Sequence, residues 1–178
     1  MRVKNVFVVV VACFAILTSG CSLVREALGT NPKEEPECVG PTFDLWGTRE
    51  VLGPAEPFNN EADRAASGTE PTTLDAIAAV AGWQGNWDRV IDVPDNTTAD
   101  ELNKWAGAAP TCWEGFIGRD VGTDDSSEGV LLFMDGEKPV QVLWYKGSEK
   151  DFRISRKSPV VQRHAVLVPN RGQMSPAE

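Results

Sequence analysis

One segment, residues 129–145, constrains the fold of this chain more than any other. Two apolar runs, Val130–Met134 and Val140–Tyr145, flank Asp135-Gly136-Glu137-Lys138, in which the glycine can take a positive φ. This arrangement predicts a β-hairpin. The first strand is apolar on both faces and the second nearly so. We therefore expect the hairpin at the centre of a sheet, covered by helices on one side and by an irregular segment or a partner on the other.

Two helices are predicted upstream of the hairpin. Thr72 or Thr73 is the expected N-cap of the first helix, which has an apolar face and ends at Gly82. The run Thr98-Ala99-Asp100-Glu101 resembles a capping box. It predicts a second helix through about residue 106, terminated by a glycine.

Further strands are expected over residues 87–93, 151–156 and 163–168. Residues 43–67 contain Gly53-Pro54 and Glu56-Pro57, which interrupt regular structure, so an irregular lead-in is expected there. These elements predict an α+β domain. Its core would be an antiparallel sheet of four or more strands, with about two helices packed on one face.

The N-terminus has the layout of a signal peptide. Arg2 and Lys4 precede an uninterrupted apolar run, Val6–Leu17. As a helix this run would cover roughly 18 Å, well short of the ~30 Å hydrocarbon core of a membrane. The following residues, Leu17-Thr18-Ser19-Gly20-Cys21, resemble the lipobox of bacterial lipoproteins.

The lipobox resemblance implies that the chain is cut before Cys21 and that lipid, palmitate included, anchors this cysteine to the extracytoplasmic face of the cell membrane. The alternative is an ordinary secretory signal that leaves Cys21 as a plain thiol. The predicted organisation is a signal peptide over residues 1–20, a lipidated tether over 21–41, one globular domain over 42–168 and a flexible polar tail over 169–178.

The remaining cysteines predict one disulfide. Cys13 would leave with the signal and Cys21 would carry lipid, so Cys38 and Cys112 would face an oxidising compartment together. The alternative is a metal site. Two cysteines without a nearby histidine cannot supply the four ligands that zinc usually takes, so we expect neither a metal nor another cofactor.

The charge of the chain argues against two classes of partner. Loss of residues 1–20 removes Arg2 and Lys4 from 17 basic and 26 acidic residues, which leaves a net charge of −11. Nucleic acid and anionic lipid headgroups bind through Lys and Arg, so neither is expected as a partner. The charge is compatible with simple solubility or with a basic protein partner.

Catalytic and metal motifs are weak in this sequence. His164 is the only histidine, and no Gly-x-Ser-x-Gly element accompanies any serine. Asp120, Asp124, Asp125 and Glu128 form an acidic loop, but their spacing does not match a calcium-binding loop. A histidine bonded to backbone or water and a solvated loop are the favoured interpretations.

Tryptophan is the one compositional excess, with six residues. Trp83 and Trp87 flank a loop-like link and, with Trp113, are the candidates for partner binding, although core packing is favoured for any single tryptophan. We favour a non-enzymatic binding module or accessory subunit of an envelope protein complex, with no small-molecule ligand identified. The alternatives are a hydrolase acting on cell wall or peptide, and an inhibitor or immunity lipoprotein.

Overall fold

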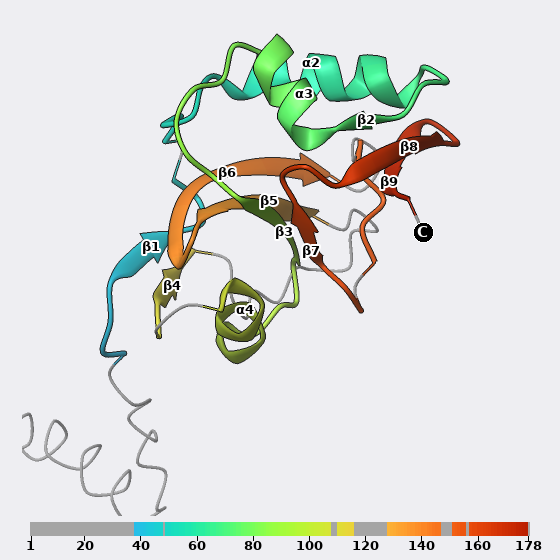
Figure 1. Ribbon diagram of the computed structural model, residues 1–178. Helices are drawn as coiled ribbons and strands as arrows, with labels where there is room; N and C mark the ends of the chain where they lie inside the picture. The colour runs from blue at the N-terminus through green and yellow to red at the C-terminus, as the bar shows by residue number, and fades with distance from the viewer. Residues whose placement is uncertain are drawn as a thin grey trace, which may run out of the picture. The chain divides into compact units, whose positions relative to one another are not determined.

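The predicted hairpin lies at the centre of the fold. β5 (Glu128–Asp135) and β6 (Lys138–Lys146) pair antiparallel, and Gly136 in the turn has a φ of 56°. The computed structural model describes residues 38–47, 49–107, 110–115, 128–146, 151–155 and 157–177. Within them, β5 and β6 join β3 (Arg89–Pro94) and β7 (Val160–Gln162) in an antiparallel sheet of order β6-β5-β3-β7 (Figure 1).

β5 is buried on both faces, as its sequence predicts. Leu131 and Phe133 point into one apolar cluster, whereas Val130, Leu132 and Met134 point into another. All five are at most 5% exposed. Because successive side chains of a strand alternate between its faces, β5 builds two cores at once and requires a cover on each side.

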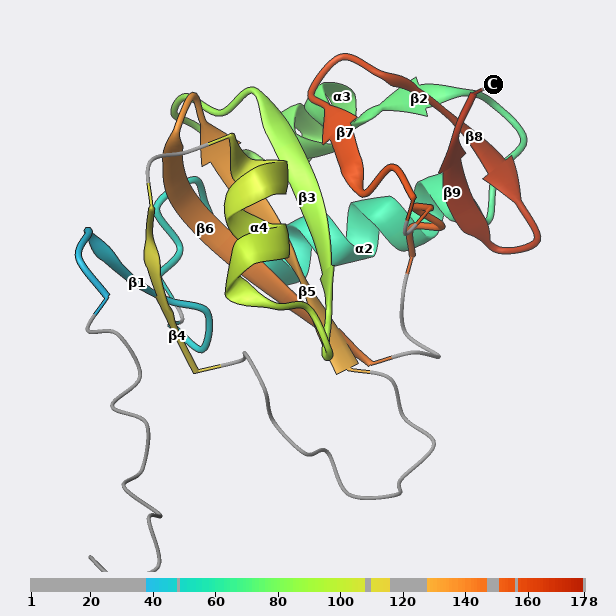
Figure 2. The same ribbon diagram turned by 90° about the horizontal axis from the view of Figure 1, so that it is seen from below.

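Two helices cover the first face and a third covers the opposite face, as Figures 1 and 2 show. α3 (Leu74–Val80) begins at the predicted N-cap, Thr73, whose hydroxyl accepts a hydrogen bond from the backbone N–H of Ala76. α4 (Ala99–Ala106) has the predicted capping box and ends at Gly107, which has a φ of 59°. The α+β class, with two helices on one face of an antiparallel sheet, is therefore confirmed.

The second helix on the first face is α2 (Ala55–Ala66), where the sequence indicated an irregular segment. That prediction was wrong. Pro54 is the N-cap residue and Pro57 lies in the first turn, where backbone N–H groups have no intrahelical partner, so neither proline removes a helical hydrogen bond. The buried stripe of α2 consists of Phe58, Ala62 and Ala66. Because only one of these side chains is large, the helical period of apolar residues is hard to recognise in the sequence.

The C-terminal residues form a second sheet instead of the predicted flexible tail. β8 (Val166–Asn170) pairs with β2 (Thr72–Thr73) on one side and with β9 (Gln173–Pro176) on the other. Met174 is fully buried in the first core. Arg171 and Gly172 take positive φ values of 53° and 78°, which allows a tight turn between β8 and β9.

Two predicted strands need adjustment. The strand expected over residues 163–168 begins later, at Val166, and extends to Asn170. Residues 151–155 alternate in burial as expected, with Phe152 and Ile154 inward, but form only a single parallel bridge between Phe152 and Met174. The sequence pattern therefore gives the inward faces correctly and overstates the strand.

A separate parallel pair of short strands lies near the N-terminal end of the described chain. β1 (Thr42–Asp44) pairs with β4 (Cys112–Glu114), and the predicted disulfide joins Cys38 to Cys112, with Cα atoms 5.7 Å apart. Leu45, directly after β1, is fully buried in the α4 core. The covalent bond thus holds the beginning of the domain against the segment that follows α4.

We predict that the disulfide contributes strongly to stability. It spans 74 residues, so replacing Cys38 and Cys112 together by serine is expected to lower the free energy of unfolding by up to about 4 kcal/mol, by relaxing a constraint on the unfolded chain. Denaturant unfolding of the full-length chain measures this. Cys21→Ser is the matched control and should leave the midpoint unchanged. Equal midpoints for the double serine variant and the wild type would contradict the prediction.

Candidate functional site

The structure places two of the three candidate tryptophans inside the protein. Trp83 is 8% exposed, stacks on Phe58 with ring centroids 4.4 Å apart, and donates from Nε1 to Pro54 O at 2.8 Å. Trp87 is 4% exposed and packs edge-on against Phe133 at 5.2 Å. The link between them, residues 84–86, is exposed as expected. Both rings turn inward, so neither presents a surface for a partner.

Trp113 is half-buried and connects two neighbouring elements of the fold. Its ring meets Phe43 edge-on at 6.0 Å, and its Nε1 donates to Asn103 Oδ1 at 2.9 Å. The same amide oxygen accepts from the Thr111 N–H at 3.1 Å. Trp113 therefore ties β4 to α4, which leaves part of its ring at the surface.

The sequence did not single out Trp46, which is exposed, or Trp144, the partly buried ring on which it stacks. Trp46 and Trp144 stack with ring centroids 4.0 Å apart and planes 20° from parallel, and Trp46 is 38% exposed. Trp46 Nε1 also donates to Gly115 O. The two rings are brought together by the turn after β1, so no local spacing could have paired them.

Beside this pair lie two adjoining cavities that we call the β1 groove. Their volumes are about 310 Å³ and 530 Å³, and both are lined by Thr42, Phe43 and Arg49. The groove runs between β1 and the N-terminal half of β6. One end of the groove holds Asp44 and Glu114, and the other is lined by Asp135, Glu137 and Lys138.

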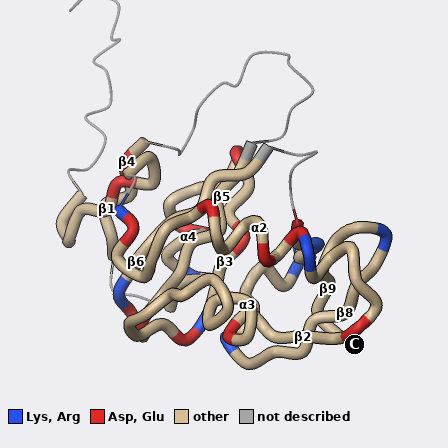
Figure 3. Tube along the Cα trace, turned by 90° about the horizontal axis from the view of Figure 1, so that it is seen from above, with Lys and Arg blue, Asp and Glu red and all other residues tan. Residues whose placement is uncertain are grey.

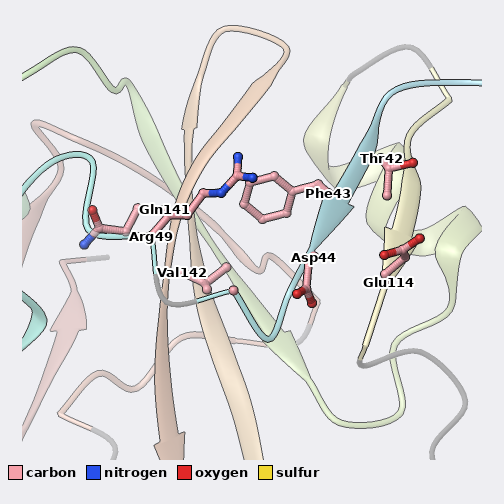
Figure 4. Close-up of a pocket in the computed structure, with 8 residues that line it drawn as sticks. Thr42, Phe43, Asp44, Arg49, Glu114, Gln141 and Val142 are labelled. Carbon is pink, nitrogen blue, oxygen red and sulfur yellow. The ribbon is translucent and has the colours of Figure 1, made fainter.

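Two carboxylates share the smaller cavity (Figure 4). Asp44 and Glu114 are register partners in the parallel β1–β4 pair, so their side chains project to the same side. Both residues are exposed. Asp44 Oδ1 accepts from the Trp46 N–H at 2.8 Å, so this carboxylate also shapes the turn that carries the tryptophan.

A buried amide forms the floor of the same cavity. Gln141 is 1% exposed; its Oε1 accepts from the Leu52 N–H at 2.8 Å and its Nε2 donates to Gly53 O at 3.0 Å. These bonds fasten the segment before α2 to β6. Gln141 thus holds one wall of the β1 groove, whereas Arg49 is exposed at its rim.

The other sequence candidates do not converge on the groove. The side chain of His164 is 78% exposed, and its Nδ1 lies 3.7 Å from Oδ2 of Asp75. Cys21 and the acidic residues Asp120, Asp124 and Asp125 lie outside the described residues, as does the side chain of Glu128. Among the residues that are described, no group of three or more His, Cys, Asp or Glu could hold a metal ion.

One carboxyl group outside the β1 groove has a raised pKa. Burial raises the pKa of Asp151 from its ordinary value of 3.8 to about 6, and the nearby carboxylate of Asp63 adds to the increase. Asp151 lines a cavity of about 170 Å³ together with Asn59 and Tyr145. The ionised form of this residue is therefore disfavoured in the folded protein.

This pKa predicts a specific dependence of stability on pH. Below about pH 4 Asp151 is protonated in both the folded and the unfolded chain, so it does not lower the free energy of unfolding. Between about pH 4 and 6 the carboxyl group ionises more readily in the unfolded chain, so the free energy of unfolding falls as the pH rises. Asp151→Asn should remove this loss and gain about 1 kcal/mol at pH 7.5, after allowance for solvent screening. Unfolding at pH 3.5 and 7.5 checks it. A gain of equal size at both pH values would show that the charge is not the cause.

Within the described part of the chain, no helix is long and apolar enough to cross a membrane. Acidic and basic positions are interspersed along the trace (Figure 3). Comparison of the chain with protein-family models, with curated proteins and with solved structures found no match in any of the three.

Proposed function

We propose that this chain is a lipid-anchored extracytoplasmic protein that acts as a non-enzymatic binding module or accessory subunit of an envelope protein complex. The observation that carries the proposal is Cys21 at the end of the apolar run Val6–Leu17, in a lipobox-like context. The disulfide between Cys38 and Cys112 agrees with an oxidising compartment, because such bonds persist there.

The β1 groove is the surface that we assign to the partner. It carries charges of both signs and lies beside the stacked pair of Trp46, which is exposed, and Trp144, which is partly buried; this combination suits a protein interface better than a uniformly charged surface. It also adjoins the strand that the disulfide fixes. A lipid anchor would raise the local concentration of the domain at the membrane, so that a weak contact through a groove of this size suffices.

A second candidate function is a hydrolase acting on cell-wall polymer or peptide, and the pairing of Asp44 with Glu114 in one cavity favours it. Two neighbouring carboxylates are the groups used in glycoside hydrolysis. Asp44→Asn and Glu114→Gln would each abolish turnover of wall polymer by an enzyme of this kind. The hydrogen bond from the Trp46 N–H to Asp44 gives that carboxylate a structural role instead, so binding remains our first proposal.

The anchor is tested by Cys21→Ala. We expect this variant to leave the membrane fraction, because a mature lipoprotein holds the membrane by at least two acyl chains and loses them with the thiol. Fractionation followed by mass spectrometry of the N-terminal peptide gives the measurement, and Cys13→Ala is the matched control. Retention of Cys21→Ala in the membrane, or an unmodified native N-terminus upstream of Cys21, would remove the lipid anchor from the proposal.

The partner is tested by crosslinking and affinity isolation of the full-length protein from native membranes. We expect one stoichiometric protein partner, lost in Glu114→Lys and retained in Glu70→Lys, which makes the same charge reversal at an exposed position outside the groove. Recovery of the chain alone would contradict an accessory role. A partner that is retained by Glu114→Lys would place the contact away from the β1 groove.

A further inference from the structure

A cavity larger than either cavity of the β1 groove is lined by residues of β7, β8 and β9. Its volume is about 880 Å³, and we call it the β7 cleft. One wall is edge strand β7, and the other is formed by Arg153, Ser155, Ser175 and Pro176. Figures 1 and 2 show β7 at the edge of the four-stranded sheet nearest this hairpin.

On the side away from β3, three of the four backbone groups of Val160 and Gln162 have no backbone partner among the described residues. The Asp92 N–H donates to Pro159 O at 2.9 Å and the Arg163 N–H donates to Asp88 O at 2.7 Å. In an antiparallel pair the hydrogen-bonded positions alternate, so Val160 and Gln162 direct their backbone groups outward. The Gln162 carbonyl accepts from the Ala165 N–H, but the Gln162 N–H and both groups of Val160 have no backbone partner among the described residues.

The opposite wall also has unpaired backbone groups, for a reason that lies in the sequence. Met174 donates to Asp151 O at 2.6 Å and accepts from the Arg153 N–H at 2.7 Å, which begins a parallel ladder. The next rung would need an N–H at residue 176. Pro176 has none, so the ladder stops, and the Arg153 C=O, the Ser155 N–H and the Pro176 C=O make no backbone bond in the described structure.

A buried side-chain hydroxyl group in the same cleft also lacks a hydrogen-bond partner among the described residues. Ser175 Oγ is buried and has no hydrogen-bond partner among the described residues, although it lines the cleft. Buried hydroxyl groups are hydrogen-bonded in the great majority of cases, so an unpaired one is unusual. An occupant with donors and acceptors at regular intervals would satisfy both walls and this hydroxyl group.

The charge of the cleft is opposite to that of the whole chain. Arg153 is the one charged side chain among the described lining residues, and it makes no ion pair with any of them. Lys157 and Arg171 are exposed nearby in the sequence of the two walls, and Figure 3 marks basic positions beside β9 and at the β8–β9 turn. In a chain of net charge −9, the described lining of this cleft thus carries a single positive charge, that of Arg153.

We propose that the β7 cleft binds an extended, acidic peptide segment of a partner protein, which adds as a strand to the edge of β7 and places a carboxylate on Arg153. Strand addition uses the outward backbone groups of the edge, here the N–H and C=O of Val160 and the N–H of Gln162, while side-chain contacts select the sequence. The proposal names the chemistry of one protein contact. It depends neither on the lipid anchor nor on the β1 groove.

The test uses the full-length chain in detergent and a fluorescently labelled eight-residue peptide that alternates Thr and Glu. We expect saturable binding by fluorescence anisotropy, with slower hydrogen exchange at the Val160 and Gln162 amides. The same peptide with its backbone nitrogens methylated at alternate positions should bind at least about fivefold more weakly, because each lost backbone bond weakens binding. A peptide alternating Thr and Lys should bind more weakly as well.

Variants separate the backbone from the side chains. Gln162→Pro removes an outward N–H that no described residue uses, and Gln162→Ala keeps this N–H while it removes the exposed side chain. We expect roughly a fivefold loss of affinity for the first variant and little change for the second. Arg153→Glu, also at an exposed position, should lower the affinity for the acidic peptide about tenfold. It should also remove the weakening of peptide binding that added salt causes in the wild type.

Several results would overturn the proposal. These are the absence of binding at millimolar peptide, equal binding of the methylated peptide, tighter binding of the lysine peptide, or equal losses in Gln162→Pro and Gln162→Ala. Unchanged unfolding midpoints of the variants show that they fold. The outcome is independent of the proposed function, because a chain that fails to retain its lipid or its envelope partner can still bind this peptide.

Discussion

The burial of β5 on both faces is the constraint on which the rest of the structure depends. A strand with apolar side chains on alternate faces is stable only when both sides of its sheet are shielded from water. α2, α3 and the β8–β9 hairpin shield one side, and α4 with Leu45 shields the other. Through Leu45, which directly follows β1, the same requirement also helps to hold the N-terminal end of the described chain.

The two edges of the central sheet are treated differently, and this explains where the surface features lie. Beside β6 the chain places β1 and the stacked tryptophans, and Gln141 fastens a further segment to the strand. Beside β7 no segment of the described chain completes the ladder. Exposed edges are sites where another strand can pair, so proteins usually cover them or keep them short. β7, Val160–Gln162, is short.

Local patterns in the sequence were sufficient for the elements whose signals are local. The hairpin turn, both predicted helix caps and the α+β class are confirmed because each depends on residues within a few positions of one another. α2 was missed because its prolines lie at its beginning, where they are tolerated, and alanines make most of its buried stripe. β9 was missed because its polar composition resembles a tail, and only pairing with β8 buries Met174.

The surface features depend on contacts between distant residues, which no local pattern reveals. Trp46 meets Trp144, and Asp44 lies beside Glu114, only after β1 pairs with β4. Trp83 and Trp87 flank a true loop, yet Phe58 and Phe133 provide an aromatic core that draws both rings inward. Composition identified tryptophan as unusual, but it could not say which rings remain exposed.

The disulfide also determines how the domain would carry a mechanical load. A pulling force that arrives at Cys38 passes through the sulfur bridge directly to Cys112, because the covalent bond is far stiffer than the chain between them. Residues 39–111 lie in the closed loop, so the covalent path of the force bypasses them while the bridge is intact. The force would therefore continue along the chain from Cys112, and reduction of the disulfide would transfer the tension to β1.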